Sequence, residues 1–181
     1  MKSTSVHSTL SILLCTGSIY IGLVFTAGGC NPFAPEERPG DLTVDLLGDP
    51  STINGFYKRF QNAYNLRDTS LYGPLIAPSF LFTYRNYEQN ADVSWGRSQE
   101  MTSTYNLFQF SQDIDLTWNN IIARFQNDEK TESQVIRRFD LTVFLEGSEV
   151  FRTDGSANFF LQRADSTLPW RIYRWRDQSD L

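Results

Sequence analysis

After about the first fifty residues, the apolar residues of the chain follow two kinds of spacing, one after the other. In the first kind, large apolar side chains recur every three or four residues, which is typical of one face of an α-helix. They are Ile53, Phe56, Tyr57, Phe60, Ala63 and Tyr64. Ser51 and Thr52 can cap the N-terminus of this helix. The same spacing predicts a short second helix capped within residues 68–70 and a third helix after Ser94.

The second kind of spacing begins after Gln112, where apolar and polar residues alternate with a period of two, as in β-strands. We expect four strands there, over residues 113–125, 134–146, 149–163 and 169–178. Short turns join them, so neighbours should be antiparallel. We expect a brief extra strand over residues 80–84, a polar loop over residues 85–92, and a bulge or bend at residues 154–155. The fold class is therefore α+β, with three N-terminal helices packed on a strongly curved antiparallel sheet.

The first thirty residues have the pattern of an export signal. After Lys2 no charged side chain occurs until Glu36, and an apolar run extends over residues 10–27. A basic start, an apolar middle and small residues before a cut are the features that signal peptidases read. Here the small residues 27–29 are followed by Cys30.

Small residues before a cysteine resemble the lipobox of bacterial lipoproteins, although Ala27 stands where that motif more often has Leu, Val or Ile. The resemblance implies removal of residues 1–29 and lipidation of Cys30, which would anchor the chain in a membrane of the bacterial cell envelope. Asn31 favours the outer membrane by the same resemblance. An uncleaved transmembrane anchor and plain secretion are the alternatives. Residues 30–45 then form a Pro-rich tether ahead of a domain over residues 46–181.

Cleavage would also remove reactive side chains. The sequence holds only one histidine and two cysteines, and His7 and Cys15 lie in the signal. Disulfides within the chain, Cys/His zinc sites and Ser-His-Asp or Cys-His catalysis are thereby excluded. We expect no metal and no cofactor. A net charge of -5 and a pI near 4.9 argue against a nucleic-acid partner.

The order of the expected elements, together with four stretches of sequence, resembles the nuclear transport factor 2 (NTF2)-like superfamily, in its SnoaL-like branch. The stretches are FYKRFQNAYNLRDTSLYGPLIAPSFLF, SWGRSQEMTSTYNLF, DGSANFFLQR and WRIYRWRD. The resemblance covers about residues 52–177 and implies a cone-shaped domain whose helices cover the concave side of the sheet. It implies no single activity, because that superfamily shares its scaffold among isomerases, dehydratases, cyclases and non-enzymes.

Candidate ligand-binding residues lie on the expected inner side of the domain. Tyr64 and Tyr105 fall on predicted buried helix faces, and Trp118 falls on the aliphatic face of the sheet. Arg137 and Arg174 lie at the ends of that face and suit an anionic ligand, because a guanidinium group matches carboxylate geometry. The alternative is that both arginines keep their stems on the core and their heads in water.

The opposite sheet face carries large rings among its polar residues, namely Phe144, Phe160, Tyr173 and Trp175. Because aromatic side chains are enriched in interface cores, we expect a homodimer through this face. The alternative is that the curl of the sheet and the C-terminal residues cover these rings within one chain.

Three functions follow from this picture. The favoured interpretation is a non-catalytic binding module, anchored to the membrane through its lipid, that takes a small apolar or anionic ligand or an envelope protein. The family resemblance implies an alternative, a ketosteroid-isomerase-like or SnoaL-like enzyme that uses a carboxylate and a tyrosine. Asp115, Asp140 and Asp177 have the parity of the outer face, so no carboxylate is expected inside. A structural dimer with a cone filled by its own side chains is the third.

Overall fold

The first two helices form where the sequence places capping residues. The structure is a computed structural model and describes residues 46–177, apart from the side chain of Ser148. The helix α2 (Ile53–Asn65) begins after Thr52, whose Oγ1 accepts a hydrogen bond from the Gly55 N–H over 3.0 Å. Asp68 caps α3 (Thr69–Tyr72) with its carboxylate, and a single 3-10 turn, η1 (Gly73–Leu75), follows. Both predicted helices are confirmed.

The third helix begins later than predicted because a strand precedes it. Residues expected as loop and helix start form β2 (Ala91–Gly96), and the helix α4 spans Arg97–Phe110. The strand β2 pairs with β1 (Ile76–Asn86), and the rings of Phe82 and Trp95 stack across the pair with centroids 4.1 Å apart. Pairing with β2 explains why β1 extends past residue 84, since each strand satisfies the backbone groups of the other. At its other end, Ile76 of β1 pairs with Ile172.

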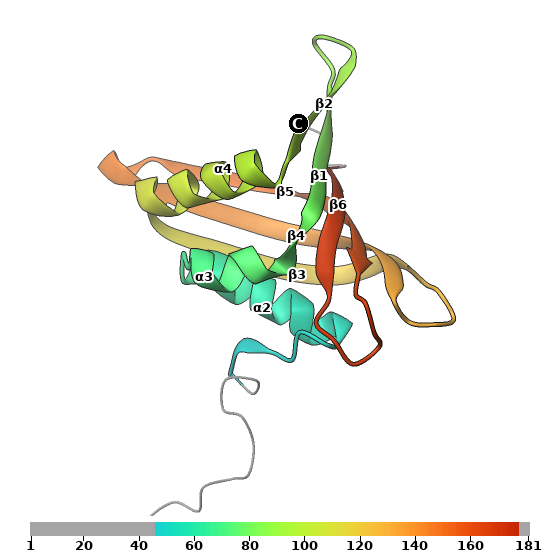
Figure 1. Cartoon of the computed structure of the whole chain (residues 1–181). Helices are drawn as coiled ribbons and strands as arrows, with labels where there is room; N and C mark the ends of the chain where they lie inside the picture. The colour runs from blue at the N-terminus through green and yellow to red at the C-terminus, as the bar shows by residue number, and fades with distance from the viewer. Residues whose placement is uncertain (1–45, 178–181) are drawn as a thin grey trace, which may run out of the picture. The chain divides into compact units, whose positions relative to one another are not determined.

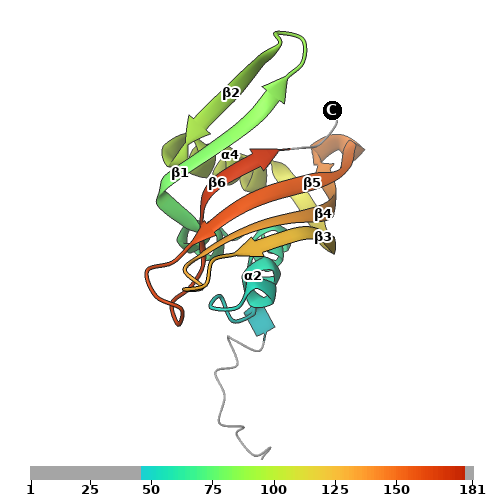
Figure 2. The same ribbon diagram turned by 90° about the vertical axis from the view of Figure 1, so that its right-hand side faces the viewer.

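Four long strands in the C-terminal half confirm the period-two pattern. They are β3 (Ser111–Gln126), β4 (Glu132–Leu145), β5 (Val150–Gln162) and β6 (Arg171–Asp177), with the turn η2 (Glu146–Ser148) between β4 and β5. The strand order is β2-β1-β6-β5-β4-β3 (Figures 1 and 2). The expectation of a wholly antiparallel sheet is wrong, because β1 and β6 run parallel. These two strands are joined through most of the domain rather than by a hairpin, so nothing forces them to be antiparallel.

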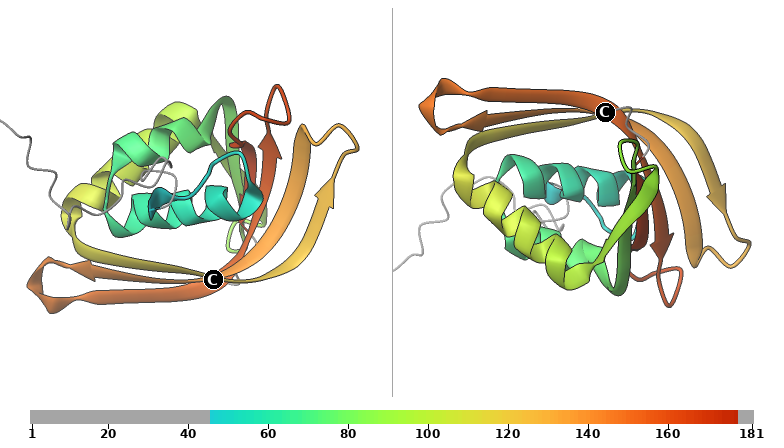
Figure 3. Two further views of the ribbon diagram at one scale, coloured as in Figure 1. Left: turned by 90° about the horizontal axis from the view of Figure 1, so that it is seen from below. Right: turned by 90° about the horizontal axis from the view of Figure 1, so that it is seen from above.

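The helices lie together on one face of this sheet (Figure 3). They do not all precede the sheet in the chain, since α4 follows β1 and β2. The predicted aliphatic face is confirmed as the inner face. Its buried members are Ile114, Leu116, Val143, Ala157, Phe159, Leu161, Trp170 and Ile172. On the helix side, α2 supplies Phe56, Tyr57 and Phe60, each at most 1% exposed.

A β-bulge in β6 reverses the alternation of its side chains. The pairing of β6 with β5 shifts between Ile172 and Arg174, so Tyr173 is an extra residue in the ladder. Ile172 is buried, Arg174 is exposed, and Trp175 packs against the core. The prediction that Arg174 lies on the inner face and Trp175 on the outer face is therefore wrong. No bulge occurs at residues 154–155, where β4 and β5 stay in register.

Candidate functional site

Aromatic rings fill the space between α2 and the inner face of the sheet. The ring of Phe159, on β5, is completely buried and lies among three others. Its centroid is 5.6 Å from that of Tyr57, 5.7 Å from that of Trp118 and 4.9 Å from that of Trp175. Phe60 contacts the same cluster, with its centroid 5.4 Å from that of Phe159. These five residues are called the ring cluster below.

Three polar atoms of the ring cluster are buried and have no hydrogen-bond partner within residues 46–177. They are the Tyr57 hydroxyl and the indole nitrogens Nε1 of Trp118 and Trp175. Leaving a buried donor unpaired costs about 1–3 kcal/mol, so most buried polar groups in proteins have partners. All three groups can donate, and the two indoles can only donate. Acceptor atoms of a bound molecule would satisfy them.

Arg137 adds a positive charge beside this cluster. It projects from the inner face of β4, and its guanidinium carbon lies 4.8 Å from the centroid of the Tyr57 ring. Its Nε donates to the backbone oxygen of Asn119 over 2.8 Å. Burial raises the pKa of the Tyr57 hydroxyl far above its ordinary value, which keeps the hydroxyl neutral and able to donate. Burial also lowers the pKa of Arg137.

A second polar group, built around a carboxylate, lies between α3 and α4. Glu100, on α4, is only 5% exposed. Its Oε1 accepts hydrogen bonds from the Tyr72 hydroxyl at 2.6 Å and from Thr104 Oγ1 at 3.3 Å, and its Oε2 accepts one from Trp95 Nε1 at 2.7 Å. Tyr64 also belongs to this group, because its ring contacts the Tyr72 ring at 5.7 Å. Burial, and next the charge of Glu100, raise the pKa of Tyr64.

The sequence interpretation missed Glu100, although a signal for it was present. Glu100, Thr104 and Phe108 are spaced by four and so share one side of a helix. All three are buried. The expectation that no carboxylate enters the interior considered strand residues only, and it is wrong for this helix residue.

The structure brings three of the five predicted ligand-binding residues to the interior. Trp118 belongs to the ring cluster, Arg137 lies beside it, and Tyr64 belongs to the Glu100 group. Tyr105 is 51% exposed, so its predicted burial is wrong; the buried side of α4 passes through positions 100, 104 and 108 instead. Arg174 lies on the outer face, with its guanidinium carbon 5.5 Å from the ring centroid of Phe160. Binding by any of them stays a prediction.

The four predicted interface rings do not form one patch. Phe160 and Tyr173 are neighbours on the outer face, with centroids 6.2 Å apart. Phe144 lies at the opposite end of β4 from the residues that pair with Phe160. Trp175 lies in the ring cluster, because of the bulge in β6. The homodimer stays a prediction, and of the four rings only Phe160 and Tyr173 lie together on that face.

Cys30 and the signal segment lie outside the described residues. Within residues 46–177, no helix has both the length and the apolar character needed to cross a membrane. The same range contains no group of three or more His, Cys, Asp or Glu side chains arranged to hold a metal ion.

No protein-family model matches the sequence, and neither does any curated protein. Solved structures do match. A conserved protein from Planctomyces limnophilus superposes with a TM-score of 0.59 and 12% identity, covering 76% of this chain and 96% of that one. An NTF2-like superfamily protein from Salmonella enterica gives 0.54 and 14%, covering 69% and 86%. A hexachlorocyclohexane dehydrochlorinase, LinA type 2, gives 0.55 and 11%, covering 76% and 89%.

Identities this low establish a shared scaffold and leave the chemistry open. The predicted scaffold is supported by the order of the elements, the mixed six-stranded sheet and these superpositions together. The described domain is an α+β domain with the NTF2-like fold.

Proposed function

We propose that this protein is a lipid-anchored protein of the bacterial envelope whose NTF2-like domain is a non-catalytic binding module for a small, mainly apolar molecule. In this proposal the sheet and helices enclose a cone, and the ligand contacts the ring cluster. The observation that carries it is the set of three buried, unpaired donors on Tyr57, Trp118 and Trp175. Sites for small ligands combine mostly apolar walls with a few well-placed polar groups, and the ring cluster offers both kinds of group.

The donors define the chemistry of the ligand. An oxygen acceptor, such as a carbonyl or carboxylate, would satisfy the Tyr57 hydroxyl, and the positive charge of Arg137 beside the same ring would favour a partly negative oxygen. The remaining contacts are with aromatic rings, which pack well against flat or apolar groups. We therefore expect a flat or apolar body that carries at least one acceptor oxygen.

Binding is favoured over catalysis because the buried carboxylate of Glu100 is engaged in hydrogen bonds within the protein. Both of its carboxylate oxygens already accept hydrogen bonds from protein groups, which hold the side chain in place. A general base needs to approach a substrate proton within hydrogen-bond distance.

Membrane anchoring through Cys30 and dimerisation through the outer face belong to the same proposal and rest on the sequence patterns.

The test is to identify what the native protein carries. The full chain is extracted from its own membranes in mild detergent, without unfolding, and its bound small molecules are analysed by mass spectrometry. We expect a stoichiometric oxygen-containing ligand that Tyr57→Phe binds about tenfold more weakly, equivalent to one lost hydrogen bond. Tyr87→Phe is the matched control, since Tyr87 is 66% exposed and lies in the turn between β1 and β2. A native protein without any bound molecule, or equal affinity in both variants, contradicts the proposal.

A second candidate is a proton-transfer enzyme that uses Glu100 as base and Tyr72 as hydrogen-bond donor. The burial of the Glu100 carboxyl group in the interior favours it, and one protein of the same fold is a dehydrochlorinase. Its test is solvent-deuterium exchange into an enolisable ketone, followed by NMR. Exchange that stops in Glu100→Gln, while the variant stays folded, would favour catalysis over simple binding.

A further inference from the structure

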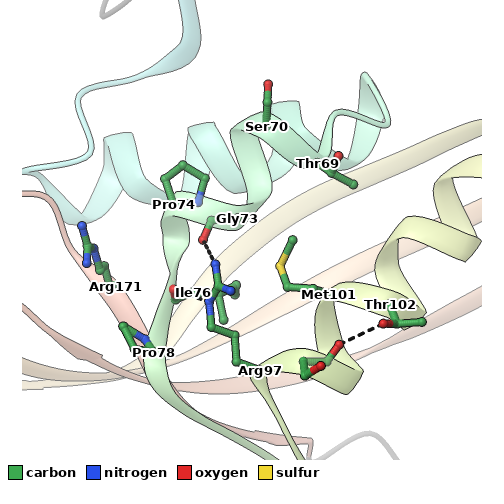
Figure 4. Close-up of a pocket in the computed structure, with 11 residues that line it drawn as sticks. Thr69, Ser70, Gly73, Pro74, Ile76, Pro78, Arg97, Met101, Thr102 and Arg171 are labelled. Carbon is green, nitrogen blue, oxygen red and sulfur yellow. Dashed lines mark hydrogen bonds between the residues drawn. The ribbon is translucent and has the colours of Figure 1, made fainter.

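A groove separate from the ring cluster runs between α3, η1 and α4. Its volume is about 940 Å³, and it extends to the first residue of β6. Figure 4 shows Gly73 and Pro74 of η1 on one side and Arg97, Met101 and Thr102 of α4 on the other. None of the residues that line it belongs to the ring cluster. The groove is therefore a separate candidate site, large enough for a small organic molecule.

Among the described residues that line the groove, two are arginines and none is acidic. Arg97 is half-buried, and its contacts in the described part of the chain are long hydrogen bonds to backbone oxygens, 3.4 Å to Ile76 and 3.3 Å to Gly73. A guanidinium group has five N–H donors, so most of those of Arg97 are left over. Arg171, at the start of β6, is exposed and adds a second positive charge. Neither arginine forms an ion pair with a described carboxylate.

Gly73 keeps the space over the Arg97 head open. A β-carbon at this position would lie 3.4 Å from Cε of Met101 and 3.9 Å from Nη2 of Arg97, in ordinary van der Waals contact with both. Gly73 has no such carbon, so this space is left to the groove, which both Gly73 and Arg97 line. A ligand oxygen in this space would meet a positive charge with unused donors.

The remaining residues that line the groove are mostly apolar or uncharged. Pro74, Pro78, Ile76 and Met101 provide apolar walls. Thr69, Ser70 and Ser98 also line the groove and add polar residues to it. The lining thus combines a cationic end with an apolar surface, which is the complement of an amphiphilic anion.

We propose that the groove between η1 and α4 binds a small amphiphilic organic anion, whose carboxylate or phosphate head contacts Arg97 and whose apolar part lies against Pro74 and Met101. The site does not depend on the interior ligand. Binding should weaken as the salt concentration rises, because both cations border open water.

Calorimetric titration of the full chain in nanodiscs of zwitterionic lipid tests this, with hexanoate, hexyl phosphate and hexan-1-ol as probes. We expect both anions to bind at least about tenfold more tightly than the alcohol, since charge-assisted hydrogen bonds are about twice as strong as neutral ones. The comparison of hexanoate with hexyl phosphate assigns the head group. Equal binding of hexan-1-ol and hexanoate, or no binding by either anion, overturns the proposal.

Variants then locate the site. Arg97→Gln should weaken anion binding at least about tenfold, whereas Arg152→Gln, an exposed arginine on β5, should leave it unchanged. Because Arg97 also contacts the backbone, Ser98→Trp is the second variant. It blocks the groove from an exposed position without removing charge. Binding that survives in a folded Ser98→Trp protein places the anion elsewhere and contradicts the assignment.

Discussion

Tyr72 donates its phenolic hydrogen to Oε1 of Glu100 over 2.6 Å, and both side chains are almost completely buried. The pair joins α3 to α4, and Trp95 joins β2 to the same carboxylate. A buried carboxylate that accepts three hydrogen bonds from neutral donors is strongly held, and its loss leaves those donors unpaired.

Replacing Glu100 should therefore destabilise the domain. In Glu100→Leu, the Tyr72 hydroxyl and the Trp95 indole lose their acceptor inside the protein. We expect the free energy of unfolding to fall by about 2–4 kcal/mol, the range for buried groups left without partners. Chemical denaturation measures it. Glu129→Gln, at an exposed turn position, is the control and should change stability by less than about 0.5 kcal/mol. Equal stabilities for the two variants would show that the Glu100 contacts contribute nothing.

Stability should decrease in alkaline solution. Burial raises the pKa of Tyr57, Tyr64 and Tyr72 above the ordinary value of 10.0. Each tyrosine ionises near pH 10 when the chain unfolds but stays neutral in the folded domain. Their stabilising effect is complete below about pH 10 and is lost as the pH rises towards the folded-state pKa, by about 1.4 kcal/mol per pH unit for each residue.

Denaturation at a series of pH values measures how steeply the free energy of unfolding falls with pH. Tyr57→Phe should reduce this slope by the contribution of one tyrosine, about 1.4 kcal/mol per pH unit. A folded protein in which tyrosinate absorbance shows all its tyrosines ionised near pH 10 would contradict the expectation.

The bulge in β6 predicts different outcomes for neighbouring residues. Trp175→Ala removes a ring that contacts Phe60, Phe82 and Phe159, so it should cost about 3–5 kcal/mol of stability. Tyr173 lies on the outer face, so Tyr173→Ala should lower the free energy of unfolding much less. If the outer face forms a dimer, Tyr173→Ala should also shift the mass measured by light scattering towards the monomer. A Trp175→Ala protein as stable as the wild type would contradict the placement of this ring in the core.

Lipidation has a direct test in the full chain. Cys30→Ser should remove the acyl groups, so the protein should move from the detergent phase to the aqueous phase in a cloud-point separation. Cys15→Ser lies within the predicted signal and should leave lipidation intact. Intact mass spectrometry of the wild-type protein should show a chain that begins at Cys30 and carries lipid. A wild-type chain that begins at Met1 would contradict the signal assignment.

Much of the fold could be predicted because local patterns determine it. Capping at Thr52 and Asp68 and the period-two alternation after Gln112 identified the helices α2 and α3 and four of the strands. The strand β2 was missed because it is short, follows a polar turn and is mostly exposed, although Ala91, Val93 and Trp95 alternate with polar residues in it. The parallel pairing of β1 with β6 is a long-range contact that no local pattern encodes.

The candidate site was less predictable for a related reason. One extra residue, Tyr173, exchanges the faces of Arg174 and Trp175, and a strict period of two cannot show such a shift. Arg137 was placed on the correct face. It lies on β4, which pairs with β5 without any shift of register. The unpaired state of the Tyr57 hydroxyl depends on its complete surroundings, which spacing alone does not describe.

Tyr57→Phe should have opposite effects on folding and on binding. In the ligand-free protein it removes a buried hydroxyl without a partner, so stability should stay constant or rise by up to about 1 kcal/mol. With the ligand present, the variant should lose part of the stabilisation that binding gives the wild type. Thermal unfolding with and without ligand measures both effects. A clear loss of stability in the ligand-free variant would mean that the hydroxyl already has a partner within the protein.

The most direct measurement is a crystal structure of the protein purified from its own membranes, at a resolution that shows ordered water. We expect electron density for a small molecule that has an oxygen atom within hydrogen-bond distance of the Tyr57 hydroxyl and contacts the rings of Trp118 and Trp175. A ring cluster closed around Phe159, with the hydroxyl and both indole nitrogens bound only to water or to nothing, would contradict it.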